Sequence, residues 1–225
     1  DVDIYGIFNF ATSTQSTTTL AKLNNEYFIQ AATSTSGLLT VGYQAGQALT
    51  ATTTTAGNIA IGYQALMTST STARTTAIGY QALMNTIDYS SANDLTAVGY
   101  QALLANTTGR DHTAVGSEAL AANTTGEANT AMGHRALFRN TTGDDNVAIG
   151  YLSADFNDTG GQNAIFGSEA MRFNRTGSAN VAIGNEAGRG NLSATSSVFI
   201  GRQAGYGNEL TYHSQGSVAI GFEAG

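Results

Sequence analysis

The strongest constraint on this chain is a short motif that returns at a nearly fixed interval. One copy reads Thr-Ala-Val-Gly-Tyr-Gln-Ala-Leu at 96–103. With its glycine as the index position, the copies are centred on Gly42, Gly62, Gly79, Gly99, Gly116, Gly133, Gly150, Gly167, Gly184, Gly201 and Gly221. Successive index glycines are 17 residues apart, or 20 at three places. A period this short cannot hold two helices but suffices for one solenoid coil, so the sequence predicts an all-β fold, a parallel β-solenoid of about eleven short coils.

The first part of the chain lies outside this repeat. We therefore divide the chain into an N-terminal cap or docking segment, 1–37, and a repeat domain, 38–225. A solenoid needs a cap over the open edge of its first coil, and an aromatic-rich segment suits that role. The alternative, placed behind the cap, is docking of another subunit, with Tyr5, Phe8 and Phe10 as candidate contacts, and Phe222 at the other end; one segment could do both.

Aligning the copies on the index glycine gives columns of equivalent residues. The residue directly before the glycine is apolar in every copy, and the residue two before it is mostly alanine. The residue three after the glycine is alanine in all copies but one, which has Ser153. Neighbouring residues of a strand point to opposite faces, so a run such as Val-Ala-Ile at 181–183 is apolar on both. One face can line the coil interior, and a second copy of the chain is the simplest cover for the other.

Applied to the motif at 96–103, this pattern assigns each side chain an environment. Val98 and Ala102 are expected to be tightly packed, and Ala97 suggests a second buried face. Tyr100 and Gln101 are expected on the lateral surface. The tyrosines that follow successive index glycines are expected to stack on one another along the rod.

Two further columns support parallel stacking. Four residues before successive index glycines stand Asn129, Asn146, Asn163 and Asn180, whose amides can hydrogen-bond along the axis as a ladder. Glu118 and Arg135 share a column in adjacent coils and are expected to form an ion pair.

The turns carry a repeated Asn-Thr-Thr-Gly sequence and its variants. Each turn asparagine begins an Asn-X-Ser/Thr sequon, at Asn106, Asn123, Asn140, Asn157, Asn174 and Asn191. These are candidate N-glycosylation sites if the turns are exposed in a secreted protein. The alternative is that asparagine and glycine are kept because a tight turn needs them.

Composition excludes several functional classes. The chain has no cysteine and a formal net charge of −7, which argues against thiolate metal sites and nucleic-acid binding. No apolar run is long enough to insert in a membrane. Charged residues make up 11%, so Thr, Ser, Asn and Gln must cover the surface, as in extracellular fibrous proteins. The three histidines are not spaced as metal ligands and no catalytic motif is present, so we expect no enzyme and no cofactor.

The copies, for example Asn-Val-Ala-Ile-Gly-Asn-Glu-Ala at 180–187, resemble the head repeats of trimeric autotransporter adhesins. They are also similar to repeats of phage-type tail fibres. The resemblance covers about 38–225 and implies a left-handed parallel β-roll with three chains around one axis. The Asn-Thr-Thr-Gly turn is an addition to the adhesin repeat. A hexapeptide β-helix of the acyltransferase kind fits less well, because the column Leu104, Ala121, Phe138, Asp155, Arg172, Arg189 is not consistently apolar.

These observations predict a structural and adhesive segment of an extracellular fibre, built from stacked coils and homotrimeric. Its partners would be copies of itself, with host-surface or glycan ligands. The alternative is a subunit of a head-to-tail extracellular filament, N-glycosylated on its turns. Ice binding needs a regular threonine ladder, and the column that begins at Thr76 and continues through Thr130 turns to Val147 and Ala164, so we set it aside.

Overall fold

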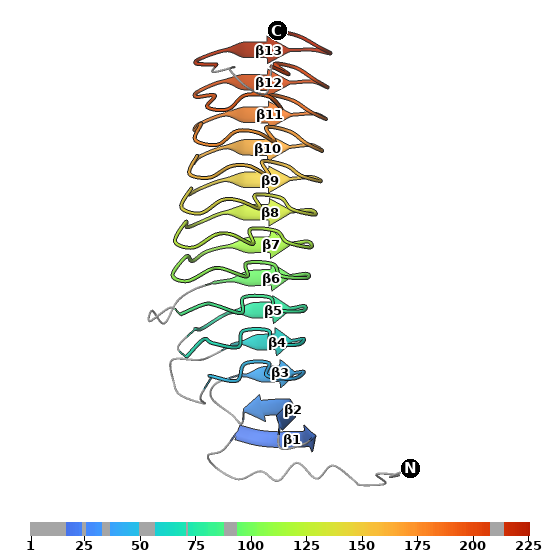
Figure 1. Cartoon of the computed structure of the whole chain (residues 1–225), viewed down its shortest axis with the longest axis vertical. Coiled ribbons are helices and arrows are strands. Elements are labelled where there is room, and N and C mark those ends of the chain that lie inside the picture. Colours follow the sequence, from blue (N-terminus) through green and yellow to red (C-terminus); the bar gives the residue numbers. More distant parts are fainter. Residues whose placement is uncertain are drawn as a thin grey trace.

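The computed structural model describes residues 17–23, 26–32, 37–49, 57–70, 72–87, 94–207 and 214–225. The strands in these ranges are β1 (Thr17–Leu23), β2 (Glu26–Ala32), β3 (Leu39–Val41), β4 (Ile59–Ile61), β5 (Thr76–Ile78), β6 (Thr96–Val98), β7 (Thr113–Val115), β8 (Thr130–Met132), β9 (Val147–Ile149), β10 (Ala164–Phe166), β11 (Val181–Ile183), β12 (Val198–Ile200) and β13 (Val218–Ile220). They form one sheet in chain order. The result is a rod of stacked coils, the predicted β-solenoid (Figure 1).

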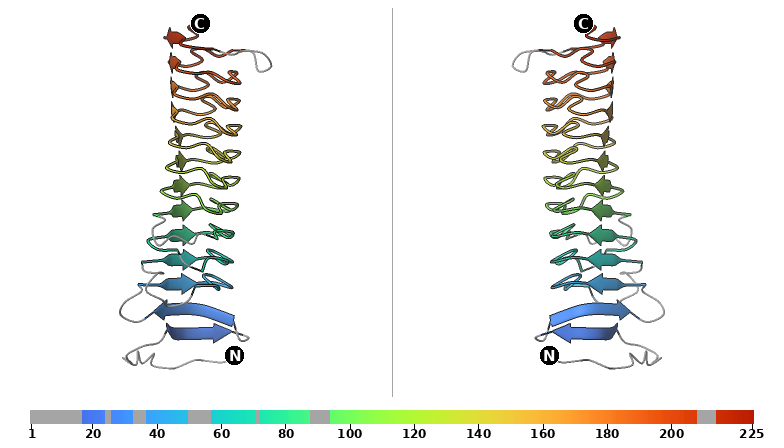
Figure 2. Two further views of the ribbon diagram at one scale, coloured as in Figure 1. Left: turned by 90° about the vertical axis from the view of Figure 1, so that its left-hand side faces the viewer. Right: turned by 90° about the vertical axis from the view of Figure 1, so that its right-hand side faces the viewer.

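The strands from β3 to β13 are parallel and in register. Each contributes the three residues before an index glycine, so Ala97 of β6 pairs with Ala114 of β7. Figure 2 shows that the strands follow one side of the rod while the turns make up the rest of each coil. The predicted coil of 17 or 20 residues is therefore confirmed, with one strand in each copy of the motif.

An antiparallel hairpin precedes the first coil. β1 pairs with β2, and β2 pairs antiparallel with β3, so the chain direction reverses where the solenoid begins. The hairpin belongs to the segment 1–37 and covers the edge of β3 (Figure 1). Tyr5, Phe8 and Phe10, the candidate docking residues of this segment, lie outside the described residues.

Each coil closes through residues in the left-handed backbone region. In the coil of Gly99, these are Gln101 at φ 52°, Leu103 at φ 54° and Asp111 at φ 60°. A left-handed residue other than glycine costs roughly 1–2 kcal/mol. Here the cost is offset by hydrogen bonds to both neighbouring coils, because the Gln101 amide donates to the Tyr80 carbonyl at 2.9 Å and the Leu103 amide to the Ala119 carbonyl at 3.0 Å.

The index position requires glycine for two reasons. Gly133 has φ +132°, outside the range that side chains readily allow, and an added Cβ would lie 2.5 Å from the Gly150 carbonyl oxygen of the next coil. Consecutive index glycines therefore stack backbone on backbone. This contact explains why the glycine is the one invariant residue of the motif.

The apolar core is a narrow column inside the coils. The inner alanine column, two residues before each index glycine, packs against the residues four after it, which are leucine in the coils of Gly62 to Gly133. Ala97 and Leu103 are both fully buried, whereas Val98 faces outward and is half-buried. This corrects the assignment of Val98 as a tightly packed residue: alanine suffices at the inner position because Leu103 fills the interior from the opposite wall.

Candidate functional site

The outward face of the sheet is an apolar surface that runs along the rod. Its main part is the outer apolar column, directly before each index glycine. The residues two positions earlier lie beside this column and are threonine in β5 to β8, at Thr76, Thr96, Thr113 and Thr130. Met132, Phe166 and Ile183 are each at least 40% exposed. The outer apolar column consists of Val41, Ile61, Ile78, Val98, Val115, Met132, Ile149, Phe166, Ile183, Ile200 and Ile220. A contiguous apolar surface of this kind marks an interaction site.

Behind the sheet, the polar half of the coil interior is filled by amide side chains. The strand ladder consists of Asn129, Asn146, Asn163 and Asn180, and it is buried throughout. Asn146 Nδ2 donates to Asn129 Oδ1 at 3.1 Å, and Asn163 and Asn180 repeat this bond at 2.9 Å. Each Oδ1 also accepts the backbone amide 17 residues later, which belongs to the next asparagine, at 3.0 Å for Asn146, or to Ser197 in the case of Asn180. The predicted ladder is confirmed.

The turn asparagines form a second ladder, which the sequence did not predict. Asn140 Nδ2 donates to Asn123 Oδ1 at 2.9 Å and to the carbonyl of Gly143 at 2.9 Å. The turn ladder consists of Asn106, Asn123, Asn140, Asn157 and Asn174, and Asn191 continues the column. The hydrogen bond from the asparagine side chain to the carbonyl of the glycine three residues later is the contact expected if asparagine and glycine are kept because the tight turn needs them.

These contacts argue against glycosylation of the sequons. The side chains of Asn106, Asn123, Asn140, Asn157, Asn174 and Asn191 are at most 1% exposed. A glycan would be attached to Nδ2, the atom that donates within the ladder. A glycan added before folding would prevent the coil from closing, so the sequons do not fit the role of acceptor sites.

Glycine carbonyls join the two ladders inside each coil. The carbonyl of Gly143 accepts from Asn140 Nδ2 at 2.9 Å and from Asn129 Nδ2 at 2.8 Å. Gly160 is placed in the same way between Asn157 and Asn146. The interior amides are therefore satisfied by one another and by backbone carbonyls, as buried polar groups must be.

His112 occupies the strand-ladder position one coil before Asn129. Its Nδ1 accepts the Asn129 backbone amide at 3.1 Å, as an asparagine Oδ1 does in later coils. Nδ1 therefore carries a lone pair in this contact, and Nε2 lies 3.1 Å from Asn123 Nδ2 of the turn ladder. Burial lowers the pKa of His112 from its usual 6.5 to about 4. The 17-residue spacing from His112 to Asn129 was the sequence signal for this placement.

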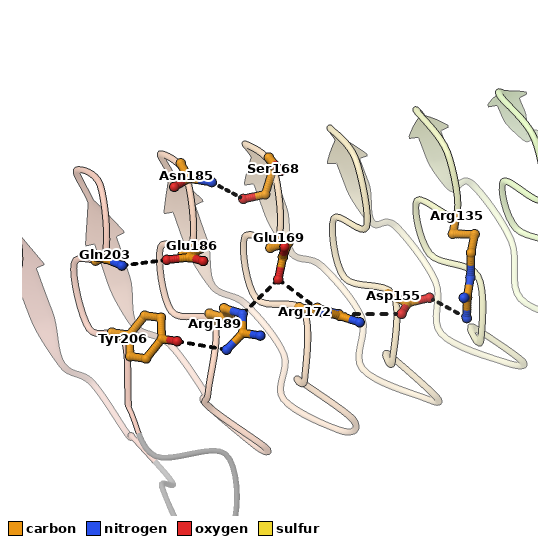
Figure 3. A network of polar contacts seen from close by, with 10 residues as sticks. All are labelled: Arg135, Asp155, Ser168, Glu169, Arg172, Asn185, Glu186, Arg189, Gln203 and Tyr206. Carbon is orange, nitrogen blue, oxygen red and sulfur yellow. Dashed lines mark hydrogen bonds and ion pairs between the residues drawn. The ribbon is translucent and has the colours of Figure 1, made fainter.

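A charged network runs along the turns on the far side of the coils from the sheet (Figure 3). The Asp155 side chain is fully buried, with Arg135 Nη2 at 3.2 Å from one oxygen and Arg172 Nε at 3.7 Å from the other. Glu169 Oε2 then joins Arg172 Nη1 at 3.0 Å and Arg189 Nε at 2.9 Å. Burial raises the pKa of Asp155 against the lowering effect of its arginines. The predicted Glu118–Arg135 ion pair is also present, at 3.7 Å.

Aromatic rings alternate with these arginines. The Arg139 guanidinium lies 4.4 Å from the centre of the Phe156 ring, and Arg172 lies 5.1 Å from that of Phe173. Within the described residues, Arg139 is exposed and has no ion pair, unlike Arg135, Arg172 and Arg189. We call Arg135, Phe138, Arg139, Asp155, Phe156, Glu169, Arg172, Phe173, Arg189 and Tyr206 the arginine–aromatic edge.

The predicted tyrosine stack is also confirmed. The rings of Tyr43, Tyr63, Tyr80 and Tyr100 stack with centroid separations of 5.5, 5.1 and 5.4 Å. Beside them, Gln64 Nε2 donates to Gln44 Oε1 at 2.8 Å, the first bond of a glutamine ladder. We call the four tyrosines the tyrosine ladder. Phe222, the remaining candidate docking residue, is 63% exposed, with the Arg202 guanidinium 5.5 Å from its ring centre.

Within the described ranges, no group of three or more histidine, aspartate or glutamate side chains is placed to hold a metal ion. Asp144 and Asp145 are consecutive acidic residues; Asp144 is exposed and accepts the Glu127 backbone amide at 2.7 Å. Across the same ranges, no helix has the length and apolar character needed to cross a bilayer. Comparison with protein families, curated proteins and solved structures finds no match.

Proposed function

We propose that this chain is a structural segment of an extracellular fibre, in which three copies pack side by side through the outward sheet face. The observation that carries this proposal is the continuous apolar surface of the outer apolar column. Most other surface positions are Thr, Ser, Asn, Gln or charged, so this face is the part of the rod that gains most from being covered.

The occupant that fits this face is another copy of the chain. The face runs along the whole stack of strands from β3 to β13, and its side chains recur once per coil. An identical rod aligned beside it presents the same spacing along its full length, so ridges and gaps match at every coil. Most soluble homo-oligomers close around a symmetry axis, and three such faces turned toward one axis would cover the outer apolar column of every chain.

Sedimentation and light scattering of the folded chain test this assembly. We expect three times the 23.2 kDa mass of one chain. Replacing Phe166 and Ile183 by lysine should produce a monomer, since both side chains lie on the outward face. The matched control replaces Thr125 and Thr142 by lysine, because both are exposed on the turns. A compact monomer of the unmodified chain would contradict the proposal, and end-to-end filaments in electron micrographs would favour the filament subunit instead.

The adhesive part of the function rests on the arginine–aromatic edge. Arg139 presents an exposed guanidinium stacked on Phe156, a pairing suited to carboxylate or sulfate groups of acidic glycans. An array of acidic and neutral glycans tests it: binding should favour the acidic ones and fall at least tenfold in Arg139→Gln. Loss of binding with retention of the trimer separates this part of the proposal from the assembly.

A further inference from the structure

The tyrosine ladder has a property that neither assembly nor adhesion uses. Its rings are nearly parallel, with interplanar angles of 14°, 8° and 11° between successive neighbours. The side chains are between 41% and 48% exposed, so a small oxidant in solution reaches each ring. We propose that the tyrosine ladder is a site of oxidative modification, at which neighbouring coils become joined by dityrosine bonds.

The backbone holds the reacting partners in place. The strands before these tyrosines pair in register, for example Ile61 with Ile78, so neighbouring tyrosines start from backbone positions about 4.8 Å apart. Each ring already contacts the next, and coupling needs only rotation of the side chains. A radical formed on any one tyrosine therefore has another tyrosine beside it without a diffusive encounter.

The chemistry balances with a one-electron oxidant. Each of two phenols gives up one electron and one proton, and the two phenoxyl radicals join through the ring carbons next to their oxygens. Each ring then loses its hydrogen at that carbon to the phenol oxygen, so the product has two hydrogens fewer than the reactants. Persulfate activated by a photoexcited metal complex accepts the two electrons and becomes two sulfate ions, and hydrogen peroxide acting through a peroxidase accepts the two electrons and two protons and becomes two waters.

The rest of the chain offers few competing routes. Cysteine and tryptophan are absent, and methionine oxidation adds oxygen and therefore has a different mass signature. Tyr151 stacks on His134 at 5.4 Å, and the Tyr206 hydroxyl contacts Arg189. Neither stacks on a second tyrosine in the described part of the chain, so both serve as internal controls.

The test is photo-oxidation of dilute folded protein with a ruthenium complex and persulfate, followed by denaturation, trypsin digestion and mass spectrometry. Arg74 lies between Tyr63 and Tyr80, so a bond between these residues joins peptides 23–74 and 75–110. We expect this joined peptide, lighter by two hydrogens than the sum of its parts, with fragments that place the bond at Tyr63 and Tyr80. The linked protein should also melt several degrees higher, since each bond restricts the unfolded chain.

Two double variants with the same number of tyrosines decide the outcome. Tyr63→Phe with Tyr100→Phe keeps a stack of rings but separates the remaining phenols by two coils, and the joined peptide should fall at least tenfold. Tyr151→Phe with Tyr206→Phe should leave it unchanged. Equal yield in both variants, bonds placed at other tyrosines, or bonds found only between chains on denaturing gels would each overturn the proposal. None of these readouts depends on the trimer.

Discussion

Phe199 occupies the space that Gly188 leaves empty. A Cβ at Gly188 would lie 2.7 Å from Phe199 Cδ2, and Gly205 in the following coil contacts the other side of the same ring. In the coils of Gly62 to Gly133 the inner alanine column faces leucine, as Ala97 faces Leu103. The large and small partners have been exchanged here, so the interior keeps its volume while the sequence of the motif changes.

This exchange predicts strong coupling between the two columns. Phe199→Ala should lower the free energy of unfolding by about 3–5 kcal/mol because it leaves a cavity. Gly205→Leu alone should be similarly harmful because the side chain collides with the ring. The double variant recreates the alanine–leucine pair of other coils and should recover most of the loss. Denaturant unfolding of the four proteins checks this, and additive losses would contradict it.

Asn140 tests the turn ladder. Asn140→Ala leaves Asn157 Nδ2 without one of its two acceptors and Asn123 Oδ1 without its donor. Both groups stay buried, so unfolding should become easier by about 3 kcal/mol. Asn185→Ala is the control, because Asn185 is exposed and should cost less than about 0.5 kcal/mol. Equal effects of the two substitutions would show that the ladder adds no stability.

The sequons give a prediction about mass. When the 225-residue chain is made in a eukaryotic cell that glycosylates Asn-X-Ser/Thr and is recovered folded, its mass should be that of the bare 23.2 kDa polypeptide. Enzymatic removal of N-glycans should not change it, because Nδ2 of the turn ladder is buried. A folded chain that carries glycan at Asn123 or Asn140 would contradict the buried ladder.

His112 makes stability depend on pH. The unfolded histidine binds a proton near pH 6.5 and the folded one at about 4. The contribution of His112 to the free energy of unfolding is therefore fully present above pH 6.5. It falls by roughly 3 kcal/mol as the pH drops to about 4, since protonation favours the unfolded chain. His112→Asn restores the ladder residue and should remove this part of the dependence. Unfolding of both proteins from pH 8 to pH 4 measures the difference, and parallel curves would refute the assignment.

Asp155 lies between two arginines that are only partly exposed. Asp155→Ala leaves Arg135 and Arg172 facing each other and should cost about 3 kcal/mol. Asp158→Ala in the same coil is the control. Asp158 and its partner Arg175 are more exposed, so this pair should contribute less than about 1 kcal/mol. Thermal unfolding of both variants distinguishes a supporting network from a set of surface ion pairs.

The repeat period alone predicted the coil, the register and the strand ladder, because each follows from stacking residues 17 apart. Which strand face turns inward could not be predicted: Ala97 and Val98 are both apolar, and the choice depends on Leu103 filling the interior from another wall. The turn ladder was missed because Asn-Thr-Thr-Gly has the composition of an exposed turn. In the Asp155 network, Asp155 and Arg172 share a column in adjacent coils and could have been paired as Glu118 and Arg135 were. Arg135 and Asp155 belong to different columns of neighbouring coils, so that contact could not be predicted from the alignment.

Because β3 to β13 pair in register, the length of the rod is set by the number of coils. Each additional coil lengthens the rod by about 4.8 Å. Recombination between two copies of the motif would shorten or lengthen the rod by whole coils and leave the new neighbours in register. The length of the rod and the chemistry of its faces can thus change independently. The length changes by gain or loss of coils, and the faces change by substitution within a column.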